Sequence, residues 1–402
     1  MRKSIVAGAL LGALAIQPAV AQISGDTVKL GVLTDMSSLY ADINGPGAVA
    51  AVQMAIEDFA GTVAGKKIEI VQADVQNKAD VAATIAGRWY DTEGVDAIFG
   101  AAASSSSIAT SRVAGDKKKV FFAPDPASSD ITGRLCNAYT IHWVYDTIAL
   151  ANGTGSAVVK AGGKDWFFLT ADYAFGHALE RDVSAVVTAN GGKVLGGVRH
   201  PLNTSDFSSF MLQAQASKAQ IIGLANAGGD TINSIKQAAE FGILKGGQKL
   251  AGLLVFITDI HSLGLEMTQG LQLTEAFYWD RNDASREFAK RFAARMKGKM
   301  PTSIQAGFYT AAKRYLEAVK TIGTDDADKI MAHLKSTPAD EPIFGKAVIR
   351  ADGRKVHDMY LFEVKKPSES KGPYDYYKLI ATIPGDQAFR PMDKGDCPLV
   401  KK

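Results

Sequence analysis

Short apolar runs alternate with longer amphipathic segments from Val28 to Trp279. An apolar run bounded by turn residues is typical of a buried strand. The runs predict strands at Val28–Leu33, Lys67–Gln72, Val95–Phe99, Val120–Ala123, Trp166–Thr170, Lys193–Val198, Gln220–Ala225, Leu250–Phe256 and Thr274–Trp279. Strands that alternate with helical segments favour an α/β architecture with parallel sheets.

The segments between these strands have helical spacing. Val49, Val52, Ile56 and Phe59 share one face of a predicted helix. Asp80 is the predicted N-cap of the next helix, because a carboxylate there can accept the free N–H groups of a first turn.

The strand–helix pattern runs through two cycles that meet near Val144. Close to this boundary, Asn152-Gly153-Thr154-Gly155 resembles a dinucleotide fingerprint without its third glycine, and we interpret it as a loop. A chain of 402 residues is long enough for two or three compact units. The two cycles predict two α/β units of similar size, followed by charged helices and, after Pro342, a hairpin-like stretch.

The N-terminus has the pattern of a cleavable export signal. Arg2 and Lys3 precede an apolar run, Ile5–Ile16, that is too short to span a bilayer. Ala19-Val20-Ala21 then supplies the small residues of a cleavage site. We predict cleavage after Ala21, a periplasmic location and a soluble mature protein.

The charge balance argues against a nucleic-acid partner. The chain has 45 Lys and Arg against 42 Asp and Glu, a formal net charge of +3. Nucleic-acid-binding domains carry a clear basic excess, which is absent here.

Cys136 and Cys397 are the two cysteines. In an exported chain such a pair is a disulfide candidate. The alternative is two separate buried thiols, which the sequence alone leaves open.

Several predicted strands end in residues suited to ligand binding, as expected at the carboxyl edge of a parallel sheet. After Phe99 comes the serine run Ser104–Ser107, whose hydroxyls and free helix N–H groups could receive a carboxylate; the alternative is a plain helix cap. Tyr173 and Phe175 could wall an apolar group or belong to the core. Asp125 and Asp259 could each face an ammonium group or serve a cap or turn.

Signatures of catalysis are absent from the sequence. It contains no G-x-S-x-G elbow, no H-E-x-x-H and no P-loop, and its six histidines lack metal-ligand spacing. We therefore expect no catalytic residue, no metal and no cofactor. The rival hypothesis from another class is an exported amidase that uses Asp125 or Asp259.

Six segments of the chain form a recognisable set. They are Lys29–Ser37 with Tyr40 and Gly45-Pro46-Gly47, Ile98-Phe99-Gly100 with the serine run, Pro124–Gly133, Asp172–Gly176, Asn203–Phe207 and Ala306–Tyr309. Taken together, these segments resemble the periplasmic solute-binding proteins of branched-chain amino acid type ABC importers, the leucine/isoleucine/valine-binding protein family. The resemblance covers nearly the whole mature chain.

This resemblance implies two Rossmann-like lobes with parallel central sheets, joined by a hinge. Residues 22–144 and 276–344 would form the first lobe. Residues 145–275 and 345–402 would form the second lobe with a C-terminal hairpin and tail. The partners would be a small-molecule ligand and an inner-membrane permease, and the protein would be a monomer.

The resemblance also implies a ligand site between the lobes. Ser104, with Ser105 and Ser106 beside it, would bind the ligand carboxylate, and Asp259 would match an ammonium-binding acid. The predicted ligand-binding residues are Tyr40, Ser104, Ser105, Ser106, Asp125, Ala127, Ser128, Trp143, Tyr173, Phe175 and Asp259.

Two ligand classes fit these residues. An α-amino acid accounts for the serine run and Asp259 together. An aromatic acid accounts for Trp143, Tyr173 and Phe175, but leaves Asp125 and Asp259 near an anion. We expect an amino acid first and an aromatic acid as the alternative.

Overall fold

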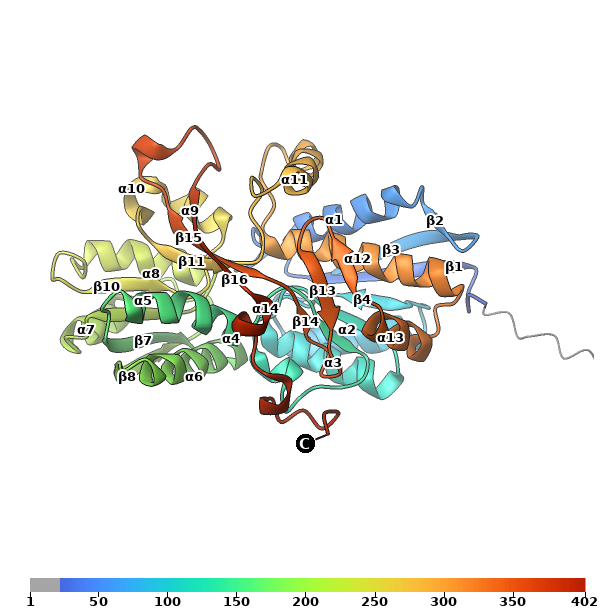
Figure 1. The fold of residues 1–402 in the computed structure, drawn as a ribbon, viewed down its shortest axis with the longest axis horizontal. Coiled ribbons are helices and arrows are strands. Elements are labelled where there is room, and N and C mark those ends of the chain that lie inside the picture. Colours follow the sequence, from blue (N-terminus) through green and yellow to red (C-terminus); the bar gives the residue numbers. More distant parts are fainter. Residues whose placement is uncertain (1–21, 402) are drawn as a thin grey trace, which may run out of the picture.

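Two parallel β-sheets, each covered by helices, form two lobes that lie side by side (Figure 1). The computed structural model describes residues 22–401, so the predicted signal segment and its cleavage point lie outside the described residues. Within this part of the chain, no helix has the length and apolar character needed to cross a membrane.

The first lobe is built on a six-stranded sheet with the order β2-β3-β1-β4-β5-β6. The strands are β1 (Thr27–Thr34), β2 (Thr62–Val63), β3 (Lys66–Asp74), β4 (Ala97–Phe99), β5 (Val120–Ala123) and β6 (Thr140–His142). All neighbours are parallel except β2, which runs antiparallel to β3.

Helices cover both faces of this sheet. They are α1 (Gly45–Asp58), α2 (Ala79–Asp91), α3 (Ser104–Lys117), α11 (Asp283–Arg295), α12 (Ser303–Ile322) and α13 (Ala327–Ser336). Successive side chains of a strand point to opposite faces. Phe99 and Phe122 therefore pack with α1 and α12, whereas Ile98 and Phe121 pack with α2 and α3.

The second lobe has a four-stranded parallel sheet with the order β10-β9-β7-β8. The strands are β7 (Asp165–Ala171), β8 (Lys193–His200), β9 (Ile221–Ala225) and β10 (Lys249–Gly252). Its helical segments are α4 (Thr147–Leu150), η2 (Ala151–Gly155), α5 (Ser156–Lys160), α6 (Ala174–Ala189), α7 (Ser208–Ala216), α8 (Gly229–Glu240), α9 (Ile257–Leu263) and α10 (Leu265–Thr268).

Two small antiparallel sheets complete the molecule. One joins β11 (Gln272–Glu275), β15 (Met359–Val364) and β16 (Tyr377–Ile383), in that order. The other joins β12 (Ala339–Glu341), β13 (Gly345–Ile349) and β14 (Lys355–Val356). The remaining short helices are η1 (Ser129–Thr132), η3 (Pro367–Glu369), α14 (Gly385–Ala388) and η4 (Met392–Lys394).

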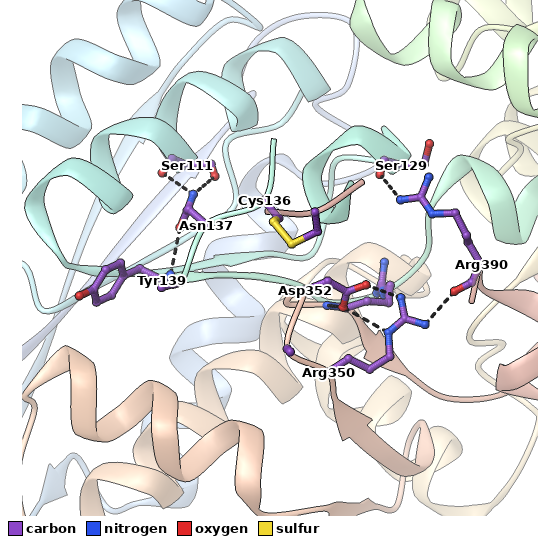
Figure 2. The surroundings of a disulfide bond; sticks show 12 residues. Ser111, Ser129, Cys136, Asn137, Tyr139, Arg350, Asp352 and Arg390 are labelled. Atoms are coloured by element: carbon purple, nitrogen blue, oxygen red, sulfur yellow. Dashed lines mark hydrogen bonds and ion pairs between the residues drawn. A yellow bond between two sulfur atoms is a disulfide. The ribbon is translucent and has the colours of Figure 1, made fainter. Parts of the chain in front are cut away.

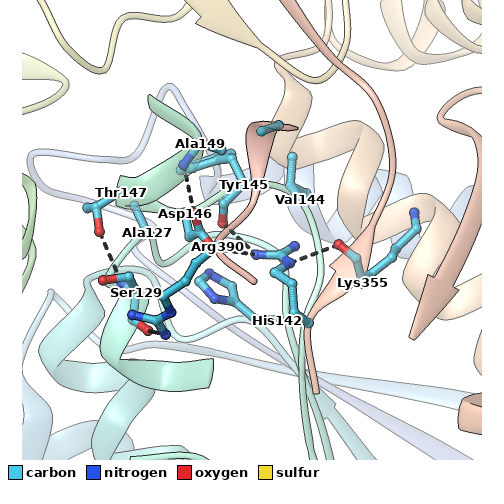
Figure 3. A network of polar contacts seen from close by, with 12 residues as sticks. Ala127, Ser129, His142, Val144, Tyr145, Asp146, Thr147, Ala149, Lys355 and Arg390 are labelled. Atoms are coloured by element: carbon cyan, nitrogen blue, oxygen red, sulfur yellow. Dashed lines mark hydrogen bonds and ion pairs between the residues drawn. The ribbon is translucent and has the colours of Figure 1, made fainter. Parts of the chain in front are cut away.

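The connections that follow β6 and β14 pass between the lobes side by side and are joined by buried polar groups (Figure 3). Arg354 is fully buried; its Nη1 donates to the Tyr145 carbonyl at 2.9 Å and its Nε to the Lys355 carbonyl at 2.8 Å. The His357 ring lies 2.7 Å from the Val144 carbonyl. Because a buried backbone carbonyl needs a donor, these side chains hold the two connections together.

The C-terminal tail returns from the second lobe to the first, where a disulfide joins Cys397 to Cys136 across a separation of 261 residues (Figure 2). The predicted pairing is therefore confirmed. The Arg390 side chain donates to the Ser129 carbonyl at 3.2 Å, and Arg350 donates to the Arg390 carbonyl at 2.8 Å.

Every predicted strand overlaps an observed one, although two end earlier than expected. The run Leu250–Phe256 leaves the sheet after Gly252, and Thr274–Trp279 leaves it after Glu275. The residues beyond Gly252 are apolar because they are buried near the cleft, and a short apolar run cannot by itself distinguish a strand from other buried backbone.

Two local predictions are wrong. The N-cap of α2 is Lys78, and Asp80 lies in the first turn, where its charge still favours the helix dipole. The segment around Gly153 is helical, not a loop, because η2 continues α4 into α5. Gly153 is required there by close packing, since a Cβ would lie 2.1 Å from the Thr274 hydroxyl.

The C-terminal part of the predicted lobe division also needs correction. Strand β13 pairs with β12 on one side and β14 on the other, and Arg354 bridges to His142 at the end of β6, so this hairpin adjoins the first lobe. The tail is attached to the first lobe through Cys136. The other boundaries stay predictions.

We expect the disulfide to stabilise the folded chain by limiting the unfolded one. On the chain-entropy model a loop of this size contributes about 5 kcal/mol, less any strain. Replacing both Cys136 and Cys397 by Ser should lower the midpoint of denaturant unfolding, and reduction of the wild-type protein should have the same effect. An unchanged midpoint in both cases would contradict the prediction.

Candidate functional site

A small cavity lies between the lobes, where strand ends of both sheets face each other. From the first lobe, the chain beyond β1, β4, β5 and β6 contributes Tyr40, Ile43, Asn44, Ala102, Ala103, Ser104, Asp125, Pro126, Ala127 and Tyr145, and α12 adds Ile304. From the second lobe, the chain beyond β7, β9 and β10 contributes Tyr173, Phe175, Ala227 and Leu254. This is the position at which open α/β sheets bind ligands.

The two lobes touch across this cavity. The Tyr40 and Tyr173 hydroxyls lie 2.6 Å apart, and a Cβ on Gly228 would lie 2.9 Å from the Leu39 carbonyl oxygen. The cavity volume is only about 20 Å³, about the space that one water molecule needs. Entry of a ligand therefore requires the lobes or these tyrosines to move.

Six of the residues predicted from sequence line the cavity: Tyr40, Ser104, Asp125, Ala127, Tyr173 and Phe175. Tyr145 was missed. It follows β6, which the sequence did not predict as a strand, so no strand end pointed to it. Ala102, Ala227 and Leu254 were missed because small or apolar side chains carry no chemical signal.

Ser104 stands at the start of α3, and its hydroxyl is oriented by backbone groups. Its Oγ accepts the N–H groups of Ala127 and Ser128, each at 3.2 Å. Because both contacts use oxygen lone pairs, the hydroxyl hydrogen stays available for an acceptor in the cavity. No side chain caps α3, whose N-cap is Ala103. A hydroxyl donor beside an uncapped helix start can receive an anion.

The other predicted serines lie outside the cavity lining. Ser106 is buried with its Oγ unpartnered, and Ser105 is half-buried. The Ser128 hydroxyl accepts the Asp130 N–H at 3.4 Å at the start of η1. Of the serine side chains proposed as ligand groups, the structure thus brings only that of Ser104 to the cavity.

Asp125 lines the cavity, and its carboxyl group also supports the turn before α3. It accepts the Ala102 N–H at 2.6 Å and the Ala101 N–H at 3.2 Å. Ala102 has a φ of +59°, in the left-handed region that side chains rarely adopt. Burial raises the pKa of Asp125 to about 7, although the two backbone N–H groups oppose this rise.

Aromatic rings form much of the remaining wall. The Tyr173 and Phe175 rings lie 5.8 Å apart, and the Tyr145 hydroxyl donates to the Asp125 carbonyl at 2.9 Å. Burial raises the pKa of Tyr40, Tyr145 and Tyr173, so their hydroxyls stay neutral. The wall is apolar with neutral hydroxyl groups, which suits an aromatic or branched body.

Trp143 and Asp259 do not line the cavity, contrary to the sequence prediction. The Trp143 ring packs edge-on against Phe122, its Nε1 donates to Thr310, and the Lys355 ammonium lies 4.1 Å from the ring centroid. Trp143 is therefore part of the first lobe's core.

Asp259 binds the start of its own helix. Its carboxylate accepts the Phe256 N–H at 2.9 Å at the N-terminus of α9. Burial raises its pKa to about 7, and the nearby Asp42 raises it further. The sequence offered this capping role as one alternative, and the structure adopts it.

A larger cavity, of about 310 Å³, lies elsewhere in the first lobe, between α11, α12 and β12. It is lined by both signs of charge, among them Arg291, Lys313 and Glu317, and the second lobe takes no part in it. We therefore place the candidate site between the lobes, where strand ends converge. Within residues 22–401, no group of three or more His, Cys, Asp or Glu could hold a metal ion.

A model of the family described as periplasmic binding proteins matches residues 27–372, most of the chain. The chain belongs to the periplasmic binding protein family. Proteins of this family are periplasmic and bind substrates rather than transform them.

Solved structures and a curated relative agree with this family. A periplasmic binding protein of Burkholderia mallei is 58% identical, with a TM-score of 0.91, covering 94% of this chain and all of that one. A branched chain amino acid ABC transporter periplasmic ligand-binding protein of Burkholderia xenovorans LB400 is 44% identical, with a TM-score of 0.82, covering 93% and 100%. The Leu/Ile/Val-binding protein homolog 6 of Brucella melitensis is 25% identical, covering 89% of this chain and 92% of that one.

We expect Ser104→Ala to weaken binding of a carboxylate ligand by about 10- to 100-fold, because a hydrogen bond to a charged group contributes about 1.5–3 kcal/mol. Ser105→Ala is the matched control and should leave affinity unchanged, since that side chain lies outside the lining. Calorimetric titration of both variants, with circular dichroism to verify folding, tests this. Equal affinities would assign Ser104 a structural role only.

We expect Asp259→Ala to lower stability by about 1 kcal/mol through loss of a helix-terminal hydrogen bond, with ligand affinity unchanged. Asp259→Asn keeps an acceptor oxygen, so its stability should lie between that of the wild type and that of Asp259→Ala. Chemical denaturation and calorimetry provide the two measurements. A large loss of affinity in Asp259→Asn would return this residue to the binding site.

Proposed function

We propose that this protein is the ligand-binding component of an ABC importer and takes up a small carboxylic acid with an apolar or aromatic body. The observation that carries the proposal is the uncapped start of α3 with the free Ser104 hydroxyl hydrogen, facing walls of Tyr40, Tyr145, Tyr173 and Phe175. The first group suits a carboxylate and the second suits a ring or branched chain.

The second lobe supplies no acid to the cavity lining. Its contributions are Tyr173, Phe175, Ala227 and Leu254. Asp259, which an ammonium group would have needed, binds the Phe256 N–H instead. The sequence objection to an aromatic acid was that Asp125 and Asp259 would lie near an anion, and for Asp259 this objection no longer holds. We therefore favour the acid without an ammonium group.

Transport would follow from movement of the lobes. Opening separates Tyr40 from Tyr173 and exposes the site, and closure around the ligand restores contact between the lobes, as in other hinged proteins. The closed form would then be presented to an inner-membrane permease.

The proposal also includes cleavage of the export signal after Ala21 and a monomeric mature protein.

An α-amino acid is the second candidate, supported by one observation. Asp125 lines the cavity beside Ser104, so its carboxylate could meet an ammonium group on the same lobe. The B. xenovorans relative, at 44% identity, is also named for branched-chain amino acids. The amidase hypothesis gains no comparable support, because the carboxyl groups of Asp125 and Asp259 are both engaged by backbone N–H groups.

Matched ligand pairs test the proposal. Thermal-shift measurements should compare phenylalanine with 3-phenylpropanoate and leucine with 4-methylpentanoate, with benzoate and benzamide as a pair that differs only in charge. We expect the acids without an ammonium group to raise the unfolding midpoint, since a ligand of the folded state stabilises it by mass action. Stabilisation by the amino acids alone would favour the second candidate, and conversion of benzamide to benzoate would favour an amidase.

A further inference from the structure

Asp125 presents a conflict of charge in the proposed site. Asp125 lines the cavity that would also hold a ligand carboxylate, and it is only 5% exposed. Two negative charges so close in a buried site repel each other strongly. Either the ligand brings a positive charge to Asp125 or one of the two carboxyl groups is neutral.

The two oxygens of Asp125 have different surroundings. Oδ2 accepts the Ala102 N–H at 2.6 Å and the Ala101 N–H at 3.2 Å, whereas Oδ1 has a single long contact, at 3.3 Å, to the Ala101 N–H. Oδ2 is thus the acceptor that supports the turn. Oδ1 retains the capacity to carry a proton without loss of a short hydrogen bond.

We propose that Asp125 is a specificity-determining residue that binds the ligand carboxylate as a neutral acid, with a proton taken from solvent on Oδ1. This inference rests on the proposed function. The Oδ1–H group would donate to the ligand beside Ser104, while Oδ2 continues to accept from Ala101 and Ala102. The complex would hold one proton on Asp125: below its pKa the proton is already bound, and above it one proton enters from solvent with each ligand anion.

The groups around Asp125 support a neutral form. No Lys, Arg or His in the described chain forms an ion pair with it. The packed elements present neutral tyrosines, namely Tyr145 from the connection after β6, Tyr40 from the chain after β1 and Tyr173 from the chain before α6. His142, at the end of β6, has its ring 2.7 Å from the carbonyl of Pro126, the residue after Asp125. Burial lowers the pKa of His142, so its ring is neutral.

Two further acids interact with the same tyrosines, and burial raises the pKa of both. Asp230 interacts with Tyr40 and Tyr173, and burial raises its pKa to about 7. Glu275 interacts with Tyr145 and Asp259, and burial raises its pKa well above its usual value. A pH profile must therefore be assigned with variants.

The proposal predicts the direction of the pH dependence. Burial places the pKa of Asp125 at about 7, so a neutral acid is available below that pH and is lost above it. The affinity for benzoate or 4-methylpentanoate, both ionised throughout, should fall about 30-fold between pH 6.0 and pH 8.5. An ammonium ligand held by charged Asp125 would give the opposite slope.

The test is calorimetric titration of benzoate and 4-methylpentanoate from pH 5.5 to pH 8.5 into the wild type, Asp125→Asn, Asp230→Asn and Asp96→Asn. Asp96 is the matched control, because its pKa is also raised to about 7 by burial but its carboxylate binds the Lys29 N–H, away from the cavity. We expect a level profile only in Asp125→Asn. At pH 8.0, titration in buffers of different ionisation enthalpy should show uptake of nearly one proton per ligand by the wild type.

The outcomes separate this inference from the proposed function. A level wild-type profile with no proton uptake, in a protein that binds either acid, overturns the role of Asp125 and leaves the function standing. A slope that persists in Asp125→Asn and disappears in Asp230→Asn assigns the proton to Asp230 and also overturns the role of Asp125.

Affinity for leucine that rises with pH and is lost in Asp125→Asn supports the amino acid candidate instead. Binding of neither acid refutes the proposed function and this inference with it. If a variant fails to fold, absence of proton uptake by the wild type still overturns the role of Asp125.

Discussion

The buried guanidinium of Arg354 is the contact on which the arrangement of the two lobes depends. Arg354 directly precedes β14. It donates to the Lys355 carbonyl of that strand and to the Tyr145 carbonyl in the connection after β6, and the Asp146 carboxylate lies 3.8 Å away. Removing a charge from water is costly, and burial lowers the pKa of Arg354 to about 10, which still leaves it charged at neutral pH. Its loss would remove the donor to two buried carbonyls and a positive charge near the Asp146 carboxylate, which also accepts the Ala149 N–H.

The same contact reaches the ligand site through a short series of hydrogen bonds. Arg354 holds the Tyr145 carbonyl, the Tyr145 hydroxyl holds the Asp125 carbonyl, and the Asp125 carboxyl group holds the turn before α3. The left-handed Ala102 lies in that turn and costs backbone energy that these hydrogen bonds offset. The hinge and the start of α3 are therefore parts of one polar network, and the geometry of the site follows from the path of the chain between the lobes.

The sequence was most informative where apolar periodicity and burial agree. The central strands of both sheets were predicted because parallel strands buried on both faces form continuous apolar runs. The residues at the ends of β4, β5 and β7 were found for the same reason, since each directly follows such a run. Tyr145 was missed because β6 is only three residues long and contains His142, which does not look like a core residue. The roles of Trp143 and Asp259 depend on the direction of their side chains, which no pattern along the chain determines. The Trp143 side chain points into the core of the first lobe, and the Asp259 carboxylate binds the start of its own helix.

The disulfide has a topological consequence. Because Cys136 and Cys397 both belong to parts of the chain attached to the first lobe, the bond closes a covalent ring that contains the whole second lobe and every segment by which the chain passes between the lobes. Both ends of every chain segment in the second lobe are therefore covalently connected to the first lobe. A single protease cut anywhere in that ring leaves the two resulting fragments linked, so the lobes stay joined even where one connection through the hinge has been severed.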